Sequence, residues 1–175
     1  MNRLRNNRCY LSGAMEFMPD LGVQWRDQIK SNLSDLGIVW LDPCKKPTNA
    51  INEQQIIPLL KAAREAGQYD KIRELGKAIR HIDLRLVDCA DFIIVNLDLS
   101  IPTTGTHEEI VTANRSKKPV LVRVVQGKSA APFWLFWMLP HELIFSTWEE
   151  IHTYLRTVDS CDSSPDLNRW LFFDL

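Results

Sequence analysis

The sequence lacks the signatures of several common protein classes. Its four cysteines show no C-x-x-C pair and no other metal-ligand spacing. No apolar run reaches the roughly 18 to 20 residues that a membrane span needs, and even the apolar segment Phe133–Leu139 is too short. We therefore expect a cytoplasmic protein that holds no metal or other cofactor, stays out of membranes and keeps its cysteines as reduced thiols, namely Cys9, Cys44, Cys89 and Cys161.

An excess of charge of one sign is also missing. The 21 Lys and Arg residues and the 22 Asp and Glu residues leave a formal net charge of −1, whereas proteins that bind nucleic acid polymers are usually strongly basic. The opening MNRLRNNR is basic, but no apolar run follows it, so we expect no signal peptide. A small anionic ligand stays open as a partner, because its binding needs only a few local donors.

What is present is a regular alternation of two kinds of segment. Short apolar segments predict strands at residues 8–12, 38–41, 92–97, 119–125 and 143–145. Segments with apolar residues at helical spacing predict helices at residues 23–36, 54–66, 69–87, 106–115 and 148–155. Strands that alternate with helices predict an α/β fold, a three-layer sandwich with a mainly parallel five-stranded sheet.

The chain length of 175 residues suits one domain with a full core. We place this domain at residues 1–158. Residues 159–175 would then form a polar linker and an apolar tail that packs on the domain or on a neighbouring subunit. Ligands of such sheets bind beyond the carboxyl ends of the strands, so we expect a site in the loops that follow the first three strands.

Two carboxylates flank the third predicted strand, and the first of them, Asp83, lies in an apolar helical stripe. Ile79, Leu86 and Val87 share its helix face, because residues three and four apart are neighbours on a helix. A charged carboxylate on a face that turns toward the core is costly unless it is paired or used. Two interpretations stay open: Asp83 pairs with Arg80 or another base, or it acts on a ligand.

The second carboxylate, Glu109, also has two interpretations. Thr106 to Glu109 fits the capping box T-x-x-E, in which Thr106 would be the N-cap residue of the helix. A carboxylate at a helix N-terminus that faces the open end of the sheet can instead be a nucleophile, held as an anion by the helix dipole. Two acids delivered to one end of a parallel strand are what acid-assisted cleavage of a glycosidic bond requires.

Loops after the strands supply further candidates. The hydroxyl and backbone N–H groups of Thr103, Thr104 and Gly105 would cradle an anion, or they would form an ordinary polar turn. Their spacing fits neither a P-loop nor a dinucleotide fingerprint. Asp42 and Asp98 each follow a predicted strand, so both are candidate site acids.

The first strand and its turn give a second group of candidates. Ser12 begins the segment SGAMEF, and Gly13 would let the backbone approach a ligand closely. Met15 and Phe17 would cover a planar base, or they would be core or lid residues. Tyr10 lies in the strand itself, where a core role and a site role are both open.

Three segments of the chain occur together in an informative order. The first is the opening CYLSGAMEF from Cys9, the second is the pattern D-L-x-x-L/V-x-x-A-D from Asp83 to Asp91, and the third is the pattern G-x-x-x-E-x-G-x-A from Gly105 to Ala113. Together they resemble the nucleoside 2-deoxyribosyltransferase family and its relatives, the 2'-deoxynucleoside 5'-monophosphate N-glycosidases. The resemblance covers most of the domain. It implies a flavodoxin-like sandwich and homodimers or larger homo-oligomers that share active sites.

The resemblance also implies roles for individual residues. Glu109 takes the place of the nucleophile, Asp83 that of the acid that positions or protonates the leaving base, and Tyr10 that of a tyrosine near the nucleophile. Ser12, Gly13 and their neighbours match the loop that lines the base and the sugar. No metal is implied in this chemistry.

Two positions depart from the family pattern. Val111 stands where the family usually has glycine after the nucleophile. Thr103, six residues before Glu109, stands where transferases of free nucleosides typically carry an Asp that holds the 5'-hydroxyl. A hydroxyl donates to phosphate without adding negative charge, whereas an Asp would repel it. This departure favours a 5'-monophosphate as substrate.

The resemblance therefore implies an enzyme of nucleotide salvage that cleaves the N-glycosidic bond of 2'-deoxynucleosides or their 5'-monophosphates. A glycosyl-Glu109 intermediate would pass the sugar to another base or to water. One alternative is a (deoxy)nucleoside 5'-monophosphate N-glycosidase that only hydrolyses, and an alternative of another class is a catalytically inactive nucleotide-binding sensor. The expected partners are small molecules: a nucleoside or nucleotide and a free base. The aromatic residues of Phe133–Leu139 more readily form a packing or subunit patch than a stacking platform.

Overall fold

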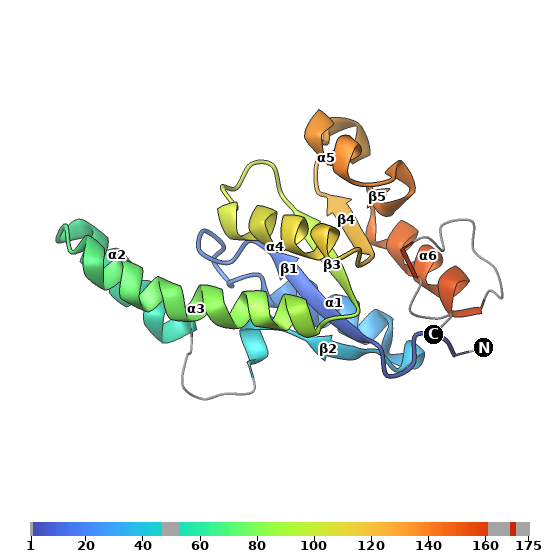
Figure 1. Cartoon of the computed structure of the whole chain (residues 1–175), viewed down its shortest axis with the longest axis horizontal. Coiled ribbons are helices and arrows are strands. Elements are labelled where there is room, and N and C mark those ends of the chain that lie inside the picture. The colour runs from blue at the N-terminus through green and yellow to red at the C-terminus, as the bar shows by residue number, and fades with distance from the viewer. Residues whose placement is uncertain (1, 47–52, 161–168, 171–175) are drawn as a thin grey trace.

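The computed structural model describes residues 2–46, 53–160 and 169–170, and in these residues five strands form one sheet (Figure 1). The order of the strands is β2-β1-β3-β4-β5, and every neighbouring pair is parallel. This order is that of flavodoxin-like folds. The predicted α/β fold with a parallel five-stranded sheet is confirmed. The strands are β1 (Arg8–Gly13), β2 (Val39–Leu41), β3 (Phe92–Leu97), β4 (Val120–Val124) and β5 (Ile144–Phe145).

Helices cover both faces of the sheet, as the alternation of segments predicts. Side chains from α1 and α6 join one buried cluster, and side chains from α3, α4 and α5 join the other. The helices are α1 (Val23–Asn32), α2 (Glu53–Glu65), α3 (Tyr69–Cys89), α4 (Thr104–Arg115), α5 (Phe133–Met138) and α6 (Trp148–Ser160). Short 3-10 turns are η1 (Ser34–Leu36), η2 (Pro43–Lys45), η3 (Lys128–Ala130) and η4 (His141–Leu143).

The alternation of side chains along β1 determines what reaches each face. Cys9 and Leu11 lie in the cluster with α1 and α6, whereas Tyr10 lies in the cluster with α3 and α4. Successive side chains of a strand point to opposite faces, so Ser12 shares the face of Tyr10. The sheet therefore presents two hydroxyl groups, two residues apart, to α4.

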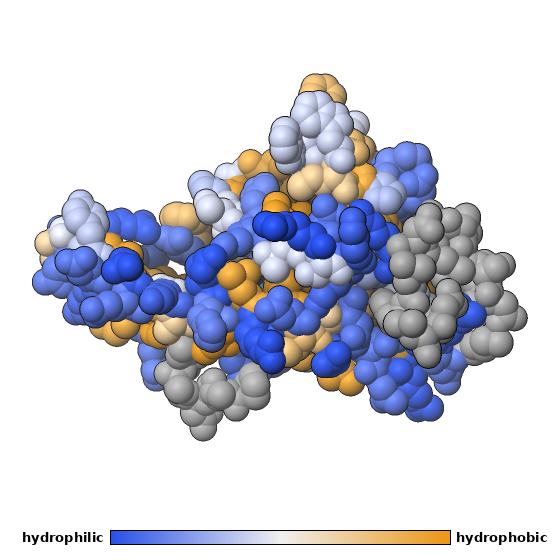
Figure 2. Space-filling view, in the orientation of Figure 1, coloured by the Kyte–Doolittle hydropathy of each residue, from blue (hydrophilic) through white to orange (hydrophobic). Residues whose placement is uncertain are grey.

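Helices α2 and α3 form a hairpin that projects beyond the sheet (Figure 1). The two helices pack on each other, and only the end of α3 is buried against the sheet, where Val87 is fully covered. Gly67 joins the helices with a backbone φ of 67°, a conformation that favours glycine. Figure 2 shows that hydrophilic residues cover most of the face of this hairpin that is turned toward the viewer.

Several predicted helix boundaries differ from the structure, and three of them are informative. The first helix ends at Asn32 and continues as η1, although Gly37 does end this region in the left-handed conformation, with φ of 65°. Helix α4 begins at Thr104, before the predicted start. Helix α6 continues to Ser160, because Val158 is buried and the Asp159 carboxylate accepts a hydrogen bond from the Leu4 backbone N–H at 2.9 Å.

The C-terminal segment lies partly outside the described residues. Asp159 and Ser160 belong to α6 and not to the predicted linker. Residues 161–168 and 171–175 are outside the described part of the chain. Trp170 is fully buried, packs against Phe92 with ring centroids 5.1 Å apart, and donates its indole N–H to the Tyr154 hydroxyl at 2.9 Å.

Cys9 and Cys89 are free thiols, Cys44 donates its thiol to the carbonyl oxygen of Leu21 at 3.6 Å, and Cys161 lies outside the described residues. Within the described ranges, no helix has the length and apolar character needed to cross a membrane. In the same part of the chain, no group of three His, Cys, Asp or Glu side chains is arranged to hold a metal ion.

Candidate active site

Glu109 lies in the second turn of α4, and its carboxylate is held by the first strand. The hydroxyl of Tyr10 donates to Oε1 at 2.7 Å, and the hydroxyl of Ser12 donates to Oε2 at 2.5 Å. The predicted capping box is wrong, because the N-cap residue is Thr103 and Thr106 lies inside the helix. The sequence pattern T-x-x-E is present, but the Glu109 side chain turns toward β1 and not toward the helix start.

Burial dominates the electrostatics of this carboxylate. Glu109 is only 9% exposed, and desolvation raises its pKa to about 7. Hydrogen bonds from Ser12 and Tyr10 pull the pKa down, while the charge of Asp83 pushes it up. Burial, and then the charge of Glu109, raise the pKa of Tyr10 well above its usual range. The phenol therefore stays protonated as a donor, and Glu109 exchanges between acid and carboxylate near neutral pH.

A cavity of about 460 Å³ opens in front of Glu109, and Asp83 lines the same cavity. Its volume lies within the roughly 300–1,000 Å³ of small-molecule sites. The walls come from the loop after β1, the α2–α3 hairpin and the N-terminus of α4. Arg64 of α2 forms an ion pair with Glu16 of the loop at 2.7 Å, so the hairpin is tied to the opposite wall.

The cavity has an apolar part and a polar part. The apolar lining comes from the loop after β1 and from the hairpin, and consists of Met15, Phe17, Ile57, Leu60, Ile79 and Leu84. The polar lining includes the start of α4, from Thr103 to Thr106, and the charged residues Glu16, Arg80, Asp83, Glu108 and Glu109. The Oγ1 atom of Thr103 is buried and has no hydrogen-bond partner within the described residues, although the residue is only 9% exposed. The described residues therefore leave the hydrogen-bonding capacity of this hydroxyl unused.

Asp83 forms an ion pair with Lys46, whose Nζ lies 2.9 Å from Oδ1. The Lys46 side chain is 2% exposed and that of Asp83 is 16% exposed. Arg80, the partner considered from the sequence, instead donates its Nε to Glu108 at 2.8 Å. The pairing interpretation is therefore confirmed, with Lys46 as the basic partner. Asp83 also lines the cavity that Glu109 lines, and its action on a ligand stays a prediction.

The loop after β1 is held by an arginine that sequence patterns did not single out. Arg26 is fully buried and donates to the backbone carbonyls of Leu11, Gly13, Leu21 and Gly22 at 3.0–3.2 Å. The sequence does contain a signal for this residue. Arg26 follows Trp25 in a helix with a buried face, and a buried arginine must find hydrogen-bond acceptors inside the protein.

Gly13 is required for packing as well as for the cavity that it lines. A Cβ atom there would lie 2.9 Å from the ring of Trp25 and 3.1 Å from the Asn96 carbonyl oxygen. Glycine at position 13 therefore allows Trp25 and the backbone of Asn96 to approach closely, whereas the sequence suggested the close approach of a ligand. Gly105 also lines the cavity, but a Cβ added there would meet nothing within 4 Å.

Several predicted ligand-binding residues lie elsewhere. Asp42 pairs with Lys30 at 2.6 Å and accepts from the Cys44 N–H at 2.8 Å, and Asp98 accepts from Ser100 and Gln126. Neither acid lines the cavity, because each is used to fix its own loop. Ser12 is fully buried and does not line the cavity, so its contact is with Glu109. Met15, Phe17, Thr103, Thr104 and Gly105 do line the cavity, and their contact with a ligand stays a prediction.

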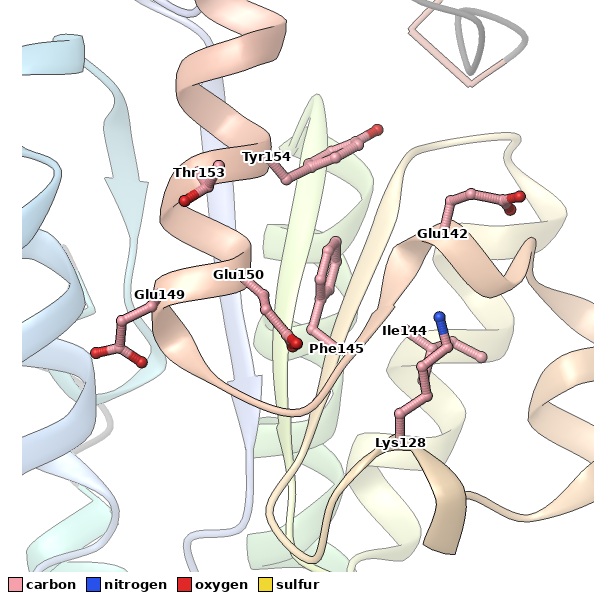
Figure 3. A pocket seen from close by; sticks show the side chains of 8 residues that line it. All are labelled: Lys128, Glu142, Ile144, Phe145, Glu149, Glu150, Thr153 and Tyr154. Atoms are coloured by element: carbon pink, nitrogen blue, oxygen red, sulfur yellow. The ribbon is translucent and has the colours of Figure 1, made fainter.

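Figure 3 shows a second cavity, of about 490 Å³, between β5, α6 and the 3-10 turns η3 and η4. Its polar groups already serve the fold. Glu150 accepts from the backbone N–H groups of Ser146 and Thr147, and Lys128 binds the carbonyl oxygen of His141. Asp83 and Glu109 do not line this cavity, so the first cavity is the candidate site.

Comparisons with known proteins give matches among solved structures only. No protein-family model matches the chain, and no curated protein matches it. A 2-deoxyribosyltransferase from Bacillus psychrosaccharolyticus is 17% identical over 84% of this chain and 91% of that chain, with a TM-score of 0.58. A 2-desoxiribosyltransferase from Leishmania mexicana is 19% identical over 69% of this chain, with a TM-score of 0.47. A CMP N-glycosidase from Clostridium botulinum is 13% identical over 86% of this chain and 98% of that chain, with a TM-score of 0.49.

These likenesses concern the fold. The chain spans 66% of the length of the Leishmania protein, about two thirds. The Bacillus structure carries the comparison, since its alignment covers most of both chains. The flavodoxin-like arrangement that the sequence resemblance implies is therefore confirmed: the chain has the α/β fold of a 2-deoxyribosyltransferase.

Proposed function

We propose that the protein cleaves the N-glycosidic bond of 2'-deoxynucleosides or their 5'-monophosphates and passes the sugar to another base or to water. The observation that carries this proposal is the buried Glu109 carboxylate, held by the hydroxyls of Tyr10 and Ser12 in front of a cavity that Asp83 also lines. A carboxylate fixed in this way suits attack on a sugar carbon.

In the proposed reaction a Glu109 oxygen attacks C1', the C1'–N bond breaks, and its electron pair leaves with the base. The transition state resembles an oxocarbenium ion, and the product is a glycosyl ester of Glu109. A second base, which gives up its N–H proton, or a water molecule then attacks C1' and releases the carboxylate. Both displacements occur at the same carbon, so the configuration at C1' is retained.

Asp83 would orient or protonate the departing base. Its ion pair with Lys46 favours the orienting role, because a carboxylate beside an ammonium group at 2.9 Å serves best as an acceptor for an N–H group of the base. The apolar lining that includes Met15 and Phe17 would contact the faces of the base.

A second candidate is a (deoxy)nucleoside 5'-monophosphate N-glycosidase, which passes the sugar to water and never to a second base. The buried hydroxyl of Thr103, for which the described part of the chain supplies no hydrogen-bond partner, favours it. This hydroxyl lies at the N-terminus of α4 beside Thr104 and Gly105. Backbone N–H groups at a helix start and nearby hydroxyls attract a phosphate group. In this reading the phosphate would bind at α4 and the base at the hairpin.

The test is to incubate the protein with a panel of 2'-deoxynucleosides, ribonucleosides and their 5'-monophosphates, with and without a second free base, and to separate the products. We expect release of free base, and a new nucleoside or nucleotide if the sugar is transferred. Glu109→Ala should abolish base release while its circular dichroism spectrum stays that of the wild type. Tight binding of a nucleotide with no release of base from any substrate would contradict the proposal and would indicate the sensor alternative.

A further inference from the structure

Ser12 does not line the cavity, yet its hydroxyl makes a hydrogen bond to a residue that does. Ser12 is fully buried and makes this hydrogen bond to Oε2 of Glu109 at 2.5 Å. Tyr10, two residues earlier on the same face of β1, holds Oε1. The two oxygens of one carboxylate are thus held by two donors that the regular spacing of the strand supplies.

We propose that Ser12 is a positioning residue for Glu109, whose hydroxyl fixes the second carboxylate oxygen and so sets the plane of the nucleophile before the substrate binds. This inference rests on the proposed function, and it assigns to Ser12 a role through Glu109 in place of contact with the sugar or the base.

Geometry explains why one donor is not enough. With Tyr10 alone, the Glu109 carboxylate could rotate about its last carbon–carbon bond while keeping a hydrogen bond from one oxygen to the phenol. A second donor on the other oxygen removes this freedom. Reactions between groups held in a fixed orientation gain rate, because the cost of ordering them is already met in the resting enzyme.

The same hydrogen bond also acts on the charge of Glu109. Four neighbours influence it: Tyr10 and Ser12 from β1, Asp83 from α3 and Arg26 from α1. Burial raises the pKa of Glu109 to about 7, and the Ser12 bond is the largest of the effects that lower it. Without Ser12 a larger fraction of Glu109 would be protonated at neutral pH, and a protonated carboxyl group cannot attack.

Ser12→Ala is the first test, and Cys9→Ala is its matched control. Both residues are fully buried in β1, both substitutions remove one heavy atom, and Cys9 faces the opposite side of the sheet. We expect Ser12→Ala to lower kcat by about 10- to 100-fold, the usual effect of removing a hydrogen bond to a charged group. KM should stay near the wild-type value, and the acidic limb of the pH–rate profile should move to higher pH. Cys9→Ala should leave the profile in place.

A second measurement does not depend on turnover. Titration of the Glu109 carboxyl carbon by NMR in ¹³C-labelled protein, with its signal identified by its loss in Glu109→Gln, should show a higher pKa in Ser12→Ala than in wild type. An unchanged titration overturns the inference, and so does a raised KM with a normal kcat, since that pattern belongs to a substrate contact. If the wild type releases no base from any substrate, the proposed function fails, while the titration still decides the role of Ser12.

Discussion

At the scale of single residues, the charge of Glu109 links stability to pH. Its pKa of about 7 in the folded protein lies above the value of 4.5 for an unperturbed side chain. The folded state therefore binds the proton more tightly than the unfolded state, and the stability that this proton brings is fully present below about pH 4.5 and lost as the pH rises through 7. The buried carboxylate is thus a source of instability that the proposed chemistry requires.

Glu109→Gln removes this penalty. The pKa difference corresponds to about 3 kcal/mol at pH 8, so we expect the variant to unfold at a higher urea concentration than the wild type at pH 8 and at a similar concentration at pH 4.5. The measurement is the free energy of unfolding as a function of pH, together with base release, which should be lost. A wild-type protein that is no less stable than the variant at pH 8 would contradict the assigned burial.

The Lys46–Asp83 pair gives a second prediction at this scale. Lys46→Met takes the ammonium group from Asp83, whose side chain is only 16% exposed, and we expect a loss of about 2–4 kcal/mol in the free energy of unfolding and a fall of at least about tenfold in base release. Lys45→Met is the control, because Lys45 is 59% exposed and pairs with Asp27 at the surface, where such a pair contributes at most about 1 kcal/mol. Equal effects of the two variants on stability and on base release would show that Lys46 has no role at the site.

At the scale of elements, the N-terminus of α4 is the proposed phosphate site. Thr103→Asp places a negative charge where the buried hydroxyl now lies. Base release from 5'-monophosphates should fall by about tenfold or more relative to the free nucleosides, because like charges repel at short range in a site of low polarity. Thr103→Val, which keeps the shape and removes the hydroxyl, is the control for packing. An equal loss on both substrate types would end the assignment of phosphate to α4.

Helix α3 contains a glycine that its packing does not require. A Cβ atom at Gly76 would meet nothing within 4 Å, and Gly76 has no left-handed backbone. Gly76→Ala should therefore raise the free energy of unfolding by about 0.5–1 kcal/mol. Gly67 has equal space but a φ of 67°, so Gly67→Ala should lower it by about 1–2 kcal/mol. Urea unfolding of the two variants measures both effects, and a destabilised Gly76→Ala would show that the hairpin packs differently.

Sequence patterns predicted elements better than the contacts between them. The apolar strand Phe92–Leu97 and the stripe around Asp83 follow from local periodicity, and both are confirmed as parts of β3 and α3. The predicted start of α4 was wrong, because a capping box requires the Glu109 side chain to turn back toward the helix start. Hydrogen bonds from β1, almost one hundred positions earlier in the chain, hold this side chain elsewhere. Local patterns carry no such information.

For the site residues too, position could be predicted from the sequence and contacts could not. Asp83 and Glu109 could be placed at one end of the sheet from the order of strands and helices, and they do line one cavity. The basic residues near them, Lys46 beside Asp83 and Arg26 near Glu109, could not be assigned from spacing, because each reaches across the fold. The loop acids Asp42 and Asp98 were expected at the site only because each follows a strand, and such loops also need carboxylates for their own hydrogen bonds.

At the scale of the whole molecule, the apolar surface of α5 bears on assembly. Phe133, Trp134 and Trp137 are 79%, 65% and 73% exposed, more apolar surface than a six-residue helix usually leaves to water. The homo-oligomer implied by the sequence resemblance stays a prediction, and this helix is where we expect the subunits to meet. Trp134→Glu with Trp137→Glu should then shift the sedimentation coefficient from that of an oligomer to that of a monomer. Tyr69→Glu, on the 73% exposed start of α3, is the control, and a monomeric wild type would contradict the expectation.

The indole of Trp170 sets a limit on how far the chain can be trimmed. A fragment that stops at Ser160 keeps every strand and helix of the described fold, and boundary rules based on secondary structure would accept it. It would nevertheless leave an indole-sized void beside Phe92 and remove the indole N–H that donates to the Tyr154 hydroxyl, a defect of about 3–5 kcal/mol. Shortened versions made for crystallisation or for fusion to other proteins should therefore retain position 170.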